Sequence, residues 1–402
     1  MPDKDSTDSA GSTGEGGNNG AVKTRTVTII SDTVNAASGR ILEAFTSSSG
    51  LVSVAVVALG FLTASVLVLA IGRNPAGIYS AILQVVSGFD LSNGTFNSYD
   101  IGEWLVGSMP LILCGFSMAF AARTGLFNIG AEGQYIAGLV AAQFIALYFP
   151  PVPVMHWLAA VIGAIAAGAL WGGIVGFFKA RFKVSEVVAT IMMNYIILYL
   201  SRYLTLLIPG TDTRKTADFP KTALLSSEML AHITNQSRLS YGLFLTIMAI
   251  FFYWIVMEKT RLGYSLRATG FNREAARSGG INVQANITAA MAIAGAFAGL
   301  AGAIVALGSF TYGRVLSGQD GYGFSGIAVA LVGNSTALGT TLAGLLFGML
   351  DSAQPLMQDR RIPDEITSII SGIIVVFISL RAGVKILAER RMKEQARGGA
   401  QR

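Results

Sequence analysis

The sequence predicts an all-α protein that crosses a membrane many times, and three observations support this fold class. The chain of 402 residues is 52% hydrophobic and only 13% charged, whereas soluble domains carry roughly 25% charged residues. Apolar runs of about 17 residues or more recur along it, which is the length that an α-helix needs to cross a bilayer. The 47 glycines suit the close packing of helices in lipid.

The same composition excludes several classes of protein. Cys114 is the only cysteine, so no internal disulfide can form. His156 and His232 are too few for a histidine-based metal site. No stretch reads Gly-x-x-x-x-Gly-Lys-Ser/Thr, so an ATP-driven step would need another chain. No spacing suits a nucleophile with its base or a metal cluster, and we expect a non-catalytic chain without a cofactor or metal of its own.

The N-terminal stretch 1–50 is rich in Ser, Thr, Gly, Asp and Asn and contains no long apolar run, which predicts a disordered tail. Residues 51–71 form the first predicted span, and the basic residues that precede it place the N-terminus inside. Asn74-Pro75 ends this span, because proline cannot continue the helical ladder. The apolar run 76–88 that follows is too short to cross a bilayer.

The basic residues gather in particular loops, and this distribution indicates which side of the membrane each loop faces. Lys179, Arg181 and Lys183 form a short basic loop inside, and the longest inside loop is 258–283. The mixed-charge loop 209–240 is expected outside. The predicted crossings in this part of the chain are 104–122, 126–149, 157–178, 187–208, 241–257 and 284–307.

Residues 324–332 and 336–350 decide the number of crossings. If they formed one crossing, the basic tail 384–402 would lie outside, against the positive-inside rule. We therefore expect 324–332 to be a half-helix that reaches inward, with 336–350 returning outward and 366–381 coming back in. This gives about ten crossings with both termini cytoplasmic. The transmembrane domain then covers 51–383.

The stretch 124–150 carries the strongest functional signal. Asn128, Glu132 and Gln134 stand in a segment otherwise fit for the bilayer interior, where an ionisable group usually faces a bundle interior or a water-filled path. Offsets of four and six residues do not share one helix face, so these side chains line one path only if the helix is interrupted near Gly130–Gly133. The alternative is a carboxylate that reaches the membrane surface beside structural amides.

Three stretches resemble the permease subunits of bacterial ABC importers in the branched-chain amino acid, ribose and nucleoside family. They are Gly125-Leu-Phe-Asn-Ile-Gly-Ala-Glu-Gly-Gln134, Gly270-Phe-Asn-Arg-Glu-Ala-Ala-Arg-Ser-Gly-Gly-Ile281 and Tyr322-Gly-Phe-Ser-Gly-Ile-Ala-Val-Ala-Leu-Val-Gly333. The first and third look most like the nucleoside importers. The similarity runs from about residue 51 to residue 385, and the 50-residue tail falls outside it.

The resemblance implies a multi-pass subunit of a bacterial cell membrane and a set of partners. A second permease subunit, often non-identical, would form the path together with this chain. Two cytoplasmic ATPase subunits would bind the ATP, and an extracytoplasmic substrate-binding protein would deliver the solute. The expected mechanism is alternating access, with the binding site near the midplane at broken helices.

A nucleoside offers a stackable base and a hydroxyl-rich sugar, which aromatic rings and hydrogen-bonding side chains can recognise. The candidates for the substrate path are Phe127, Asn128, Glu132, Gln134, Asn194, Tyr322, Phe324 and Ser325. Asn194 equally fits a hydrogen bond between helices, and aromatic residues of a membrane bundle often only pack or face lipid. A pentose or another small polar solute is the nearest alternative substrate.

The loop 258–283 looks like the coupling loop that docks on the ATPase. Its sequence predicts a short helix with Asn272 as N-cap and Gly279 as C-cap, and an Ala-Ala pair that permits close approach to a partner. The candidate coupling residues are Gly270, Asn272, Arg273, Glu274, Ala275, Ala276, Arg277 and Gly280. Two alternatives stay open: a solvated basic loop that only sets topology, and an ion-coupled secondary transporter with Glu132 as its carrier.

Overall fold

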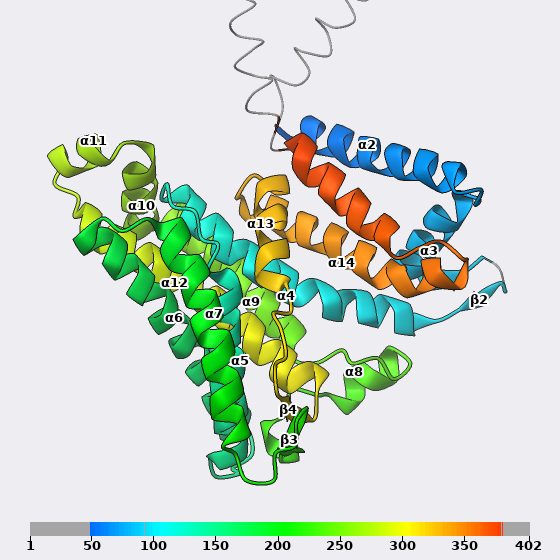
Figure 1. The fold of residues 1–402 in the computed structure, drawn as a ribbon, viewed down its shortest axis with the longest axis horizontal. Coiled ribbons are helices and arrows are strands. Elements are labelled where there is room, and N and C mark those ends of the chain that lie inside the picture. The colour runs from blue at the N-terminus through cyan, green and yellow to red at the C-terminus, as the bar shows by residue number, and fades with distance from the viewer. Residues whose placement is uncertain (1–48, 92, 379, 381–402) are drawn as a thin grey trace, which may run out of the picture. The chain divides into compact units, whose positions relative to one another are not determined.

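The computed structural model describes residues 49–91, 93–378 and 380 (Figure 1). Nearly all of the described residues belong to one compact unit, within Ala55–Ser379. Almost all of the predicted tail 1–50 and all of the predicted tail 384–402 lie outside the described residues.

The described residues are mostly helical, which confirms the all-α class. In chain order the elements are α2 (Ser49–Ala70), α3 (Ala76–Ser87), β1 (Phe89–Asp90), β2 (Thr95–Phe96), α4 (Ser98–Arg123), α5 (Ala131–Tyr148), α6 (Met155–Phe182), α7 (Glu186–Leu206), β3 (Lys215–Asp218), the 3-10 helix η1 (Lys221–Ala223), α8 (Glu228–Ile233), α9 (Gly242–Trp254), the π-helix η2 (Ile255–Lys259), α10 (Arg261–Phe271), α11 (Arg273–Ser278), α12 (Val283–Ile304), the π-helix η3 (Val305–Ser309), β4 (Tyr312–Arg314), α13 (Tyr322–Val332), α14 (Ala337–Asp359) and a last helix Glu365–Ile378. The strands form two antiparallel ribbons, β1 with β2 and β3 with β4.

Five helical segments are long and apolar enough to cross a membrane. They are α4, α6, α7, α9 with its π-helical continuation to Lys259, and α12 with its continuation to Ser309. Several shorter apolar helices, α13 among them, accompany these five. Length and composition together confirm a polytopic membrane protein.

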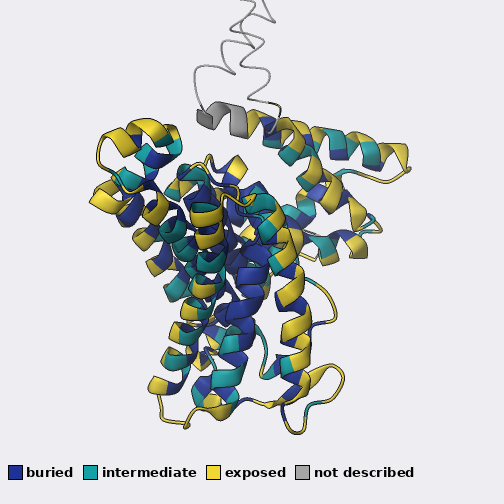
Figure 2. Ribbon diagram, turned by 60° about the vertical axis from the view of Figure 1, so that its left-hand side comes forward, coloured by how far each residue is buried: buried dark blue, intermediate teal, exposed yellow. Residues whose placement is uncertain are grey.

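The helices α4 and α12 form the centre of the bundle. In each of them 83% of the most apolar stretch is buried, against 33% in α6 and 28% in α7 and in α9. The outer helices therefore keep large apolar side chains exposed, which lipid or another protein chain can cover. Figure 2 shows the buried residues gathered inside the bundle and the exposed ones on its outer surfaces and loops.

Small residues let α6 and α12 approach each other closely. A Cβ at Gly168 would lie 2.3 Å from the Gly295 carbonyl oxygen, and one at Gly299 would lie 2.3 Å from that of Ala164. Only helices without side chains at the contact can pack backbone to backbone in this way. Gly168 of α6 therefore packs directly against the backbone of α12.

The short helix expected at 324–332 is present as α13, separate from α14, and two helices extend beyond the crossings predicted for them. α4 begins at Ser98 rather than at 104, because the Asn97 side chain accepts from the Tyr99 N–H and caps a polar first turn. α14 continues to Asp359 rather than ending at 350. Its apolar run stops there, but Ala353 and Met357 remain buried and carry the packed face onward.

Candidate functional site

The segment predicted as 126–149 becomes helical only at Ala131, so the chain before it is irregular. α4 ends at Arg123 and α5 begins only at Ala131, and Gly125 between them has a φ of 72°. Glycine adopts this left-handed conformation at little cost, so the chain can turn here between two helices. We call residues 124–130 the α4–α5 break.

Asn128 in the break and Gln134 on α5 form a reciprocal amide pair. Asn128 Nδ2 donates to Gln134 Oε1 at 2.9 Å, and Gln134 Nε2 donates to Asn128 Oδ1 at 3.1 Å. The hydroxyl of Ser117 on α4 accepts a further hydrogen bond from Asn128 at 3.0 Å. All three side chains are buried. The break brings Asn128 and Gln134 together, and the protein itself uses their hydrogen-bonding groups.

Asn194 on α7 fastens the other side of the break. Its Oδ1 accepts from the backbone N–H of Gly133 at 2.9 Å, and its Nδ2 donates to the carbonyl oxygen of Ile129 at 3.0 Å. A Cβ at Gly133 would lie 2.6 Å from that Oδ1, so the close approach needs glycine. Asn194 thus makes hydrogen bonds between helices, which is one of the two interpretations that the sequence left open.

Glu132 connects α5 to the half-helix α13. Its side chain is fully buried, and its two oxygens accept hydrogen bonds from the backbone N–H groups of Gly321 at 2.8 Å and Gly323 at 2.6 Å. The first N–H groups of a helix have no partner within the helix and favour a negative charge. Gly321, the N-cap of α13, has no side chain to cap them. Glu132 supplies the cap from another helix.

A second ionic contact lies beside the start of α13. The Tyr135 hydroxyl donates to Asp320 Oδ2 at 2.7 Å, and Arg314 on β4 pairs with the same carboxylate. Burial opposes the Arg314 cation, but its hydrogen bond to Asp320 outweighs this and raises the pKa of the guanidinium above its usual value. A cavity of about 320 Å³ opens here, lined by the β3–β4 ribbon and the chain that leads into α13.

The aromatic candidates differ from the polar ones in their accessibility. Phe127 is 38% exposed and Phe324 is 40% exposed, and Tyr322 and Ser325 are half-buried. The Tyr322 ring lies against the Tyr135 ring with centroids 5.5 Å apart. The buried polar candidates therefore shape the break, and the aromatic ones are more exposed. Contact of any of these residues with substrate stays a prediction.

The loop predicted as 258–283 contains two helices rather than one, α10 and α11. Asn272 caps α11 as expected, because its Oδ1 accepts from the N–H groups of Glu274 and Ala275 at 3.0 Å each. Ala276 is buried, while Phe271 at the tip is 96% exposed. The sequence reasoning did not single out Phe271.

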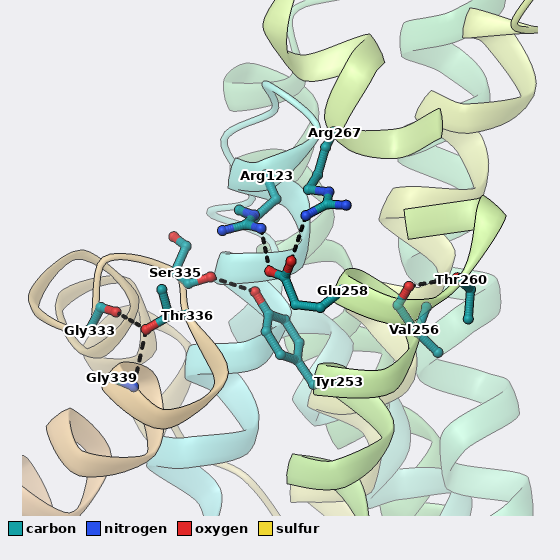
Figure 3. A network of polar contacts seen from close by, with 10 residues as sticks. All are labelled: Arg123, Tyr253, Val256, Glu258, Thr260, Arg267, Gly333, Ser335, Thr336 and Gly339. Carbon is teal, nitrogen blue, oxygen red and sulfur yellow. Dashed lines mark hydrogen bonds and ion pairs between the residues drawn. The ribbon is translucent and has the colours of Figure 1, made fainter. Parts of the chain in front are cut away.

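Residues 253–273, which we call the α9–α10 hub, connect several distant segments (Figure 3). The Tyr253 hydroxyl donates to the carbonyl oxygen of Ser335, in the turn between α13 and α14, at 2.7 Å. Glu258 in the π-helix η2 pairs with Arg123 and with Arg267, each at 2.5 Å. The sequence could not pair Glu258 with Arg123, because 135 residues separate them.

Asp351 is a further residue that the sequence reasoning missed. It is exposed, and the structure gives it no hydrogen bond or ion pair with any described residue. On α14 it follows Phe347 by four positions and Gly344 by seven, which places all three on one face. The other two are buried, so on this face the helix becomes exposed at Asp351. A carboxylate within an apolar helix was the available signal.

The described residues contain no group of three or more His, Cys, Asp or Glu side chains placed to hold a metal ion. Interrupted helices that meet inside a polytopic bundle through a buried carboxylate are characteristic of membrane transport proteins. The comparison with protein families agrees with this class. Residues 101–379 match the family described as "Branched-chain amino acid transport system / permease component". The chain belongs to this permease family and is a multi-pass membrane protein.

Three relatives illustrate the range within the family. The chain is 39% identical to the guanosine ABC transporter permease protein NupP of Bacillus subtilis, over 86% of this chain and 97% of the relative. It is 33% identical to the nucleoside ABC transporter permease protein NupB of Lactococcus lactis, over 84% and 92%. It is 31% identical to the glucose ABC transporter permease protein TsgB13 of Haloferax volcanii, over 70% and 76%.

Proposed function

We propose that this chain is the transmembrane subunit of an ATP-driven importer and forms, with a second permease subunit, the path for a nucleoside. The observation that carries the proposal is Glu132, which joins the start of α5 to the start of α13. Two broken helices held together at one buried carboxylate provide a junction that can open to either side in turn. The names of NupP and NupB favour a nucleoside, and that of TsgB13 keeps a sugar as the alternative.

The proposed topology has about ten crossings with both termini cytoplasmic. The half-helix α13 followed by the full-length α14 supports it, since a broken pair keeps the basic C-terminal residues inside. In this topology the α10–α11 segment and the basic loop after α6 share the cytoplasmic side. The β3–β4 ribbon then lies on the extracytoplasmic side of the cell membrane.

The path itself would be divided between two kinds of residue. Phe127 and Phe324 are accessible enough to contact a base. Tyr322 and Ser325, which are close to Phe324 in sequence, are half-buried. Asn128, Gln134 and Asn194 would act mainly by holding the break in shape, because their polar groups already have partners. A moving solute would meet these amides only if the amide pair opens during the cycle.

The partners would bind different surfaces of the protein. An ATPase subunit, which would carry the ATP, would take the exposed end of the α10–α11 segment, where Phe271 and the Glu274–Arg277 pair stand free of the bundle. A substrate-binding protein would approach the β3–β4 side. A second, non-identical permease subunit would cover part of the apolar surface that the outer helices leave exposed.

Reconstitution tests the proposal. The chain should transport nothing alone in liposomes, and nucleoside uptake should appear only with the second permease, the ATPase, the binding protein and ATP. Uptake by the chain alone under an ion gradient would instead establish a secondary transporter. Thermal-shift measurements on the binding protein with nucleosides and with sugars identify the solute class, because a ligand stabilises the protein that binds it.

A further inference from the structure

The α4–α5 break and the turn between α13 and α14 both contact the same short segment, the α9–α10 hub. At one side, Tyr253 donates its hydroxyl hydrogen to Ser335 in the turn between α13 and α14. At the other side, Gly270 on α10 lies directly on the α4–α5 break, and a Cβ there would be 2.4 Å from the Arg123 carbonyl oxygen and 2.9 Å from the Gly125 nitrogen. A displacement of the hub would therefore reach both the α4–α5 break and the turn between α13 and α14.

The backbone contact at Gly270 can transmit only one direction of movement. Atoms in contact resist being pushed together, because overlap is costly, but dispersion holds them only weakly when they are pulled apart. A cycle that alternates between two states needs movement in both directions. The hub therefore requires ties that resist separation as well as a surface that resists compression.

Glu258 supplies such a tie. Its Oε1 pairs with Arg123 at the end of α4, and its Oε2 pairs with Arg267 in the middle of α10, each at 2.5 Å. One carboxylate thus links the end of α4 to α10 (Figure 3). Without it the two guanidinium groups would face each other with like charge, which opposes their approach. The carboxylate both joins the helices and removes the repulsion.

The backbone around Glu258 is unusual in a way that fits this position. Residues Ile255–Lys259 form a π-helical turn between α9 and α10. Such turns are rare and often occur at functional sites. The start of α10 folds tightly onto it, since a Cβ at Gly263 would lie 2.2 Å from the Val256 carbonyl oxygen. The turn and α10 therefore move as one piece, with Glu258 facing α4.

We propose that Glu258 is a positioning residue that passes the movement of the α10–α11 segment to the α4–α5 break by holding Arg123 and Arg267 together. This inference rests on the proposed function, since it assumes that an ATPase moves α11. Arg273 adds a second tie, because its Nη2 donates to the Gly125 carbonyl oxygen at 3.0 Å. Glu258 itself touches neither the solute path nor the exposed end of α11, so its effect is on coupling.

The experiment measures ATP consumed per solute imported by the complete transporter in nanodiscs and liposomes. Glu258→Gln keeps the size of the side chain but removes its charge, and Arg267→Gln cuts the same tie from the other end. Glu103→Gln is the matched control, because it removes the charge from the 2.5 Å Glu103–Arg238 ion pair, which lies outside the hub. Hydrogen exchange at residues 124–130, with and without ATP, reports movement of the break.

We expect both hub variants to bind the ATPase normally but to spend about threefold more ATP per solute, as the loss of half-exposed ion pairs allows. The ATP-dependent change in exchange at 124–130 should shrink in both and persist in Glu103→Gln. An unchanged ratio in both hub variants would overturn the inference, and so would loss of ATPase binding, which assigns Glu258 to docking. If the unaltered transporter imports solute without ATP, the proposed function itself is wrong.

Discussion

At the α4–α5 break the side chains of Asn128, Glu132 and Asn194 are buried, whereas at the α9–α10 hub the charges that join segments are partly exposed. Asn128, Glu132 and Asn194 are all within 1% of full burial. The side chains of Arg123, Glu258 and Arg267 are 25%, 36% and 35% exposed. The two regions solve the same structural task, the joining of segments far apart in the sequence, in different surroundings.

The surroundings decide how firmly each region is held. A buried hydrogen bond is difficult to lose, because the groups left behind cannot bind water instead. A half-exposed ion pair loses little when it opens, since water and salt solvate both charges, and it contributes typically under about 1 kcal/mol. The contacts of the break are thus costlier to lose than those of the hub, and substitutions at the break should destabilise the protein most.

The largest effect is expected at Glu132. Glu132→Ala removes both acceptors and leaves the N–H groups of Gly321 and Gly323 buried without partners. Losing two hydrogen bonds to a charged group costs about 3 kcal/mol or more, so the melting temperature of the purified protein should fall sharply and uptake should cease. Glu132→Gln keeps one acceptor, so its melting temperature should lie between those of Glu132→Ala and the original chain. Equal melting temperatures for Glu132→Ala and the original chain would contradict the capping assignment.

The next effect compares two buried amides, one with partners and one without. Asn194→Leu leaves the Gly133 N–H and the Ile129 carbonyl unsatisfied and should destabilise the protein by about 2 kcal/mol. Gln143 is equally buried, but neither polar atom of its side chain has a partner among the described residues. Gln143→Leu should therefore be neutral or stabilising. Denaturant titration in detergent measures both, and a larger loss for Gln143→Leu would contradict the comparison.

The sequence predicted the break better than it predicted the partners across it. Glycines and misplaced polar residues within 124–134 are local signals; they pointed to an interruption near Gly130–Gly133, and the structure has it slightly earlier, between Arg123 and Ala131. Its partners in other segments are the side chains of Ser117 and Asn194 and the backbone N–H groups at the start of α13. The distance of Asn194 from Gly133, 61 residues along the chain, is closed only by packing, which no local pattern records. The same reason explains why the Glu258 pairs were missed.

The apolar pattern also misjudged where helices end. A run of hydrophobic residues marks the part of a helix that meets lipid or core, and α14 passes beyond that part at Leu350. Its continuation through Asp351 and Pro355 is decided by the buried face, on which Ala353 and Met357 lie. The predicted run ended just before the first carboxylate, and for this reason Asp351 was not considered.

The contact between the two regions gives a smaller effect. Gly270→Ala places a Cβ 2.4 Å from the Arg123 carbonyl oxygen, and such crowding costs about 1–3 kcal/mol. We expect a moderately lower melting temperature and a loss of ATP-driven uptake. Gly279→Ala is the control in the same segment, because its Cβ would meet nothing closer than 3.5 Å. If both variants transport equally, the contact does not take part in coupling.

The smallest effect concerns an exposed turn before the β3–β4 ribbon. Asp212 Oδ1 accepts from the N–H groups of Arg214 at 2.6 Å and Lys215 at 2.7 Å, and these hydrogen bonds lower the pKa of its carboxyl below the usual value. A lowered pKa means that the stabilisation is present above the unfolded pKa of about 3.9 and is lost as the pH falls through the folded pKa. Exchange protection of the two amides should therefore fall only in strong acid. In Asp212→Asn, whose amide oxygen accepts at every pH, protection should not depend on pH, and the same acid loss there would contradict the assignment.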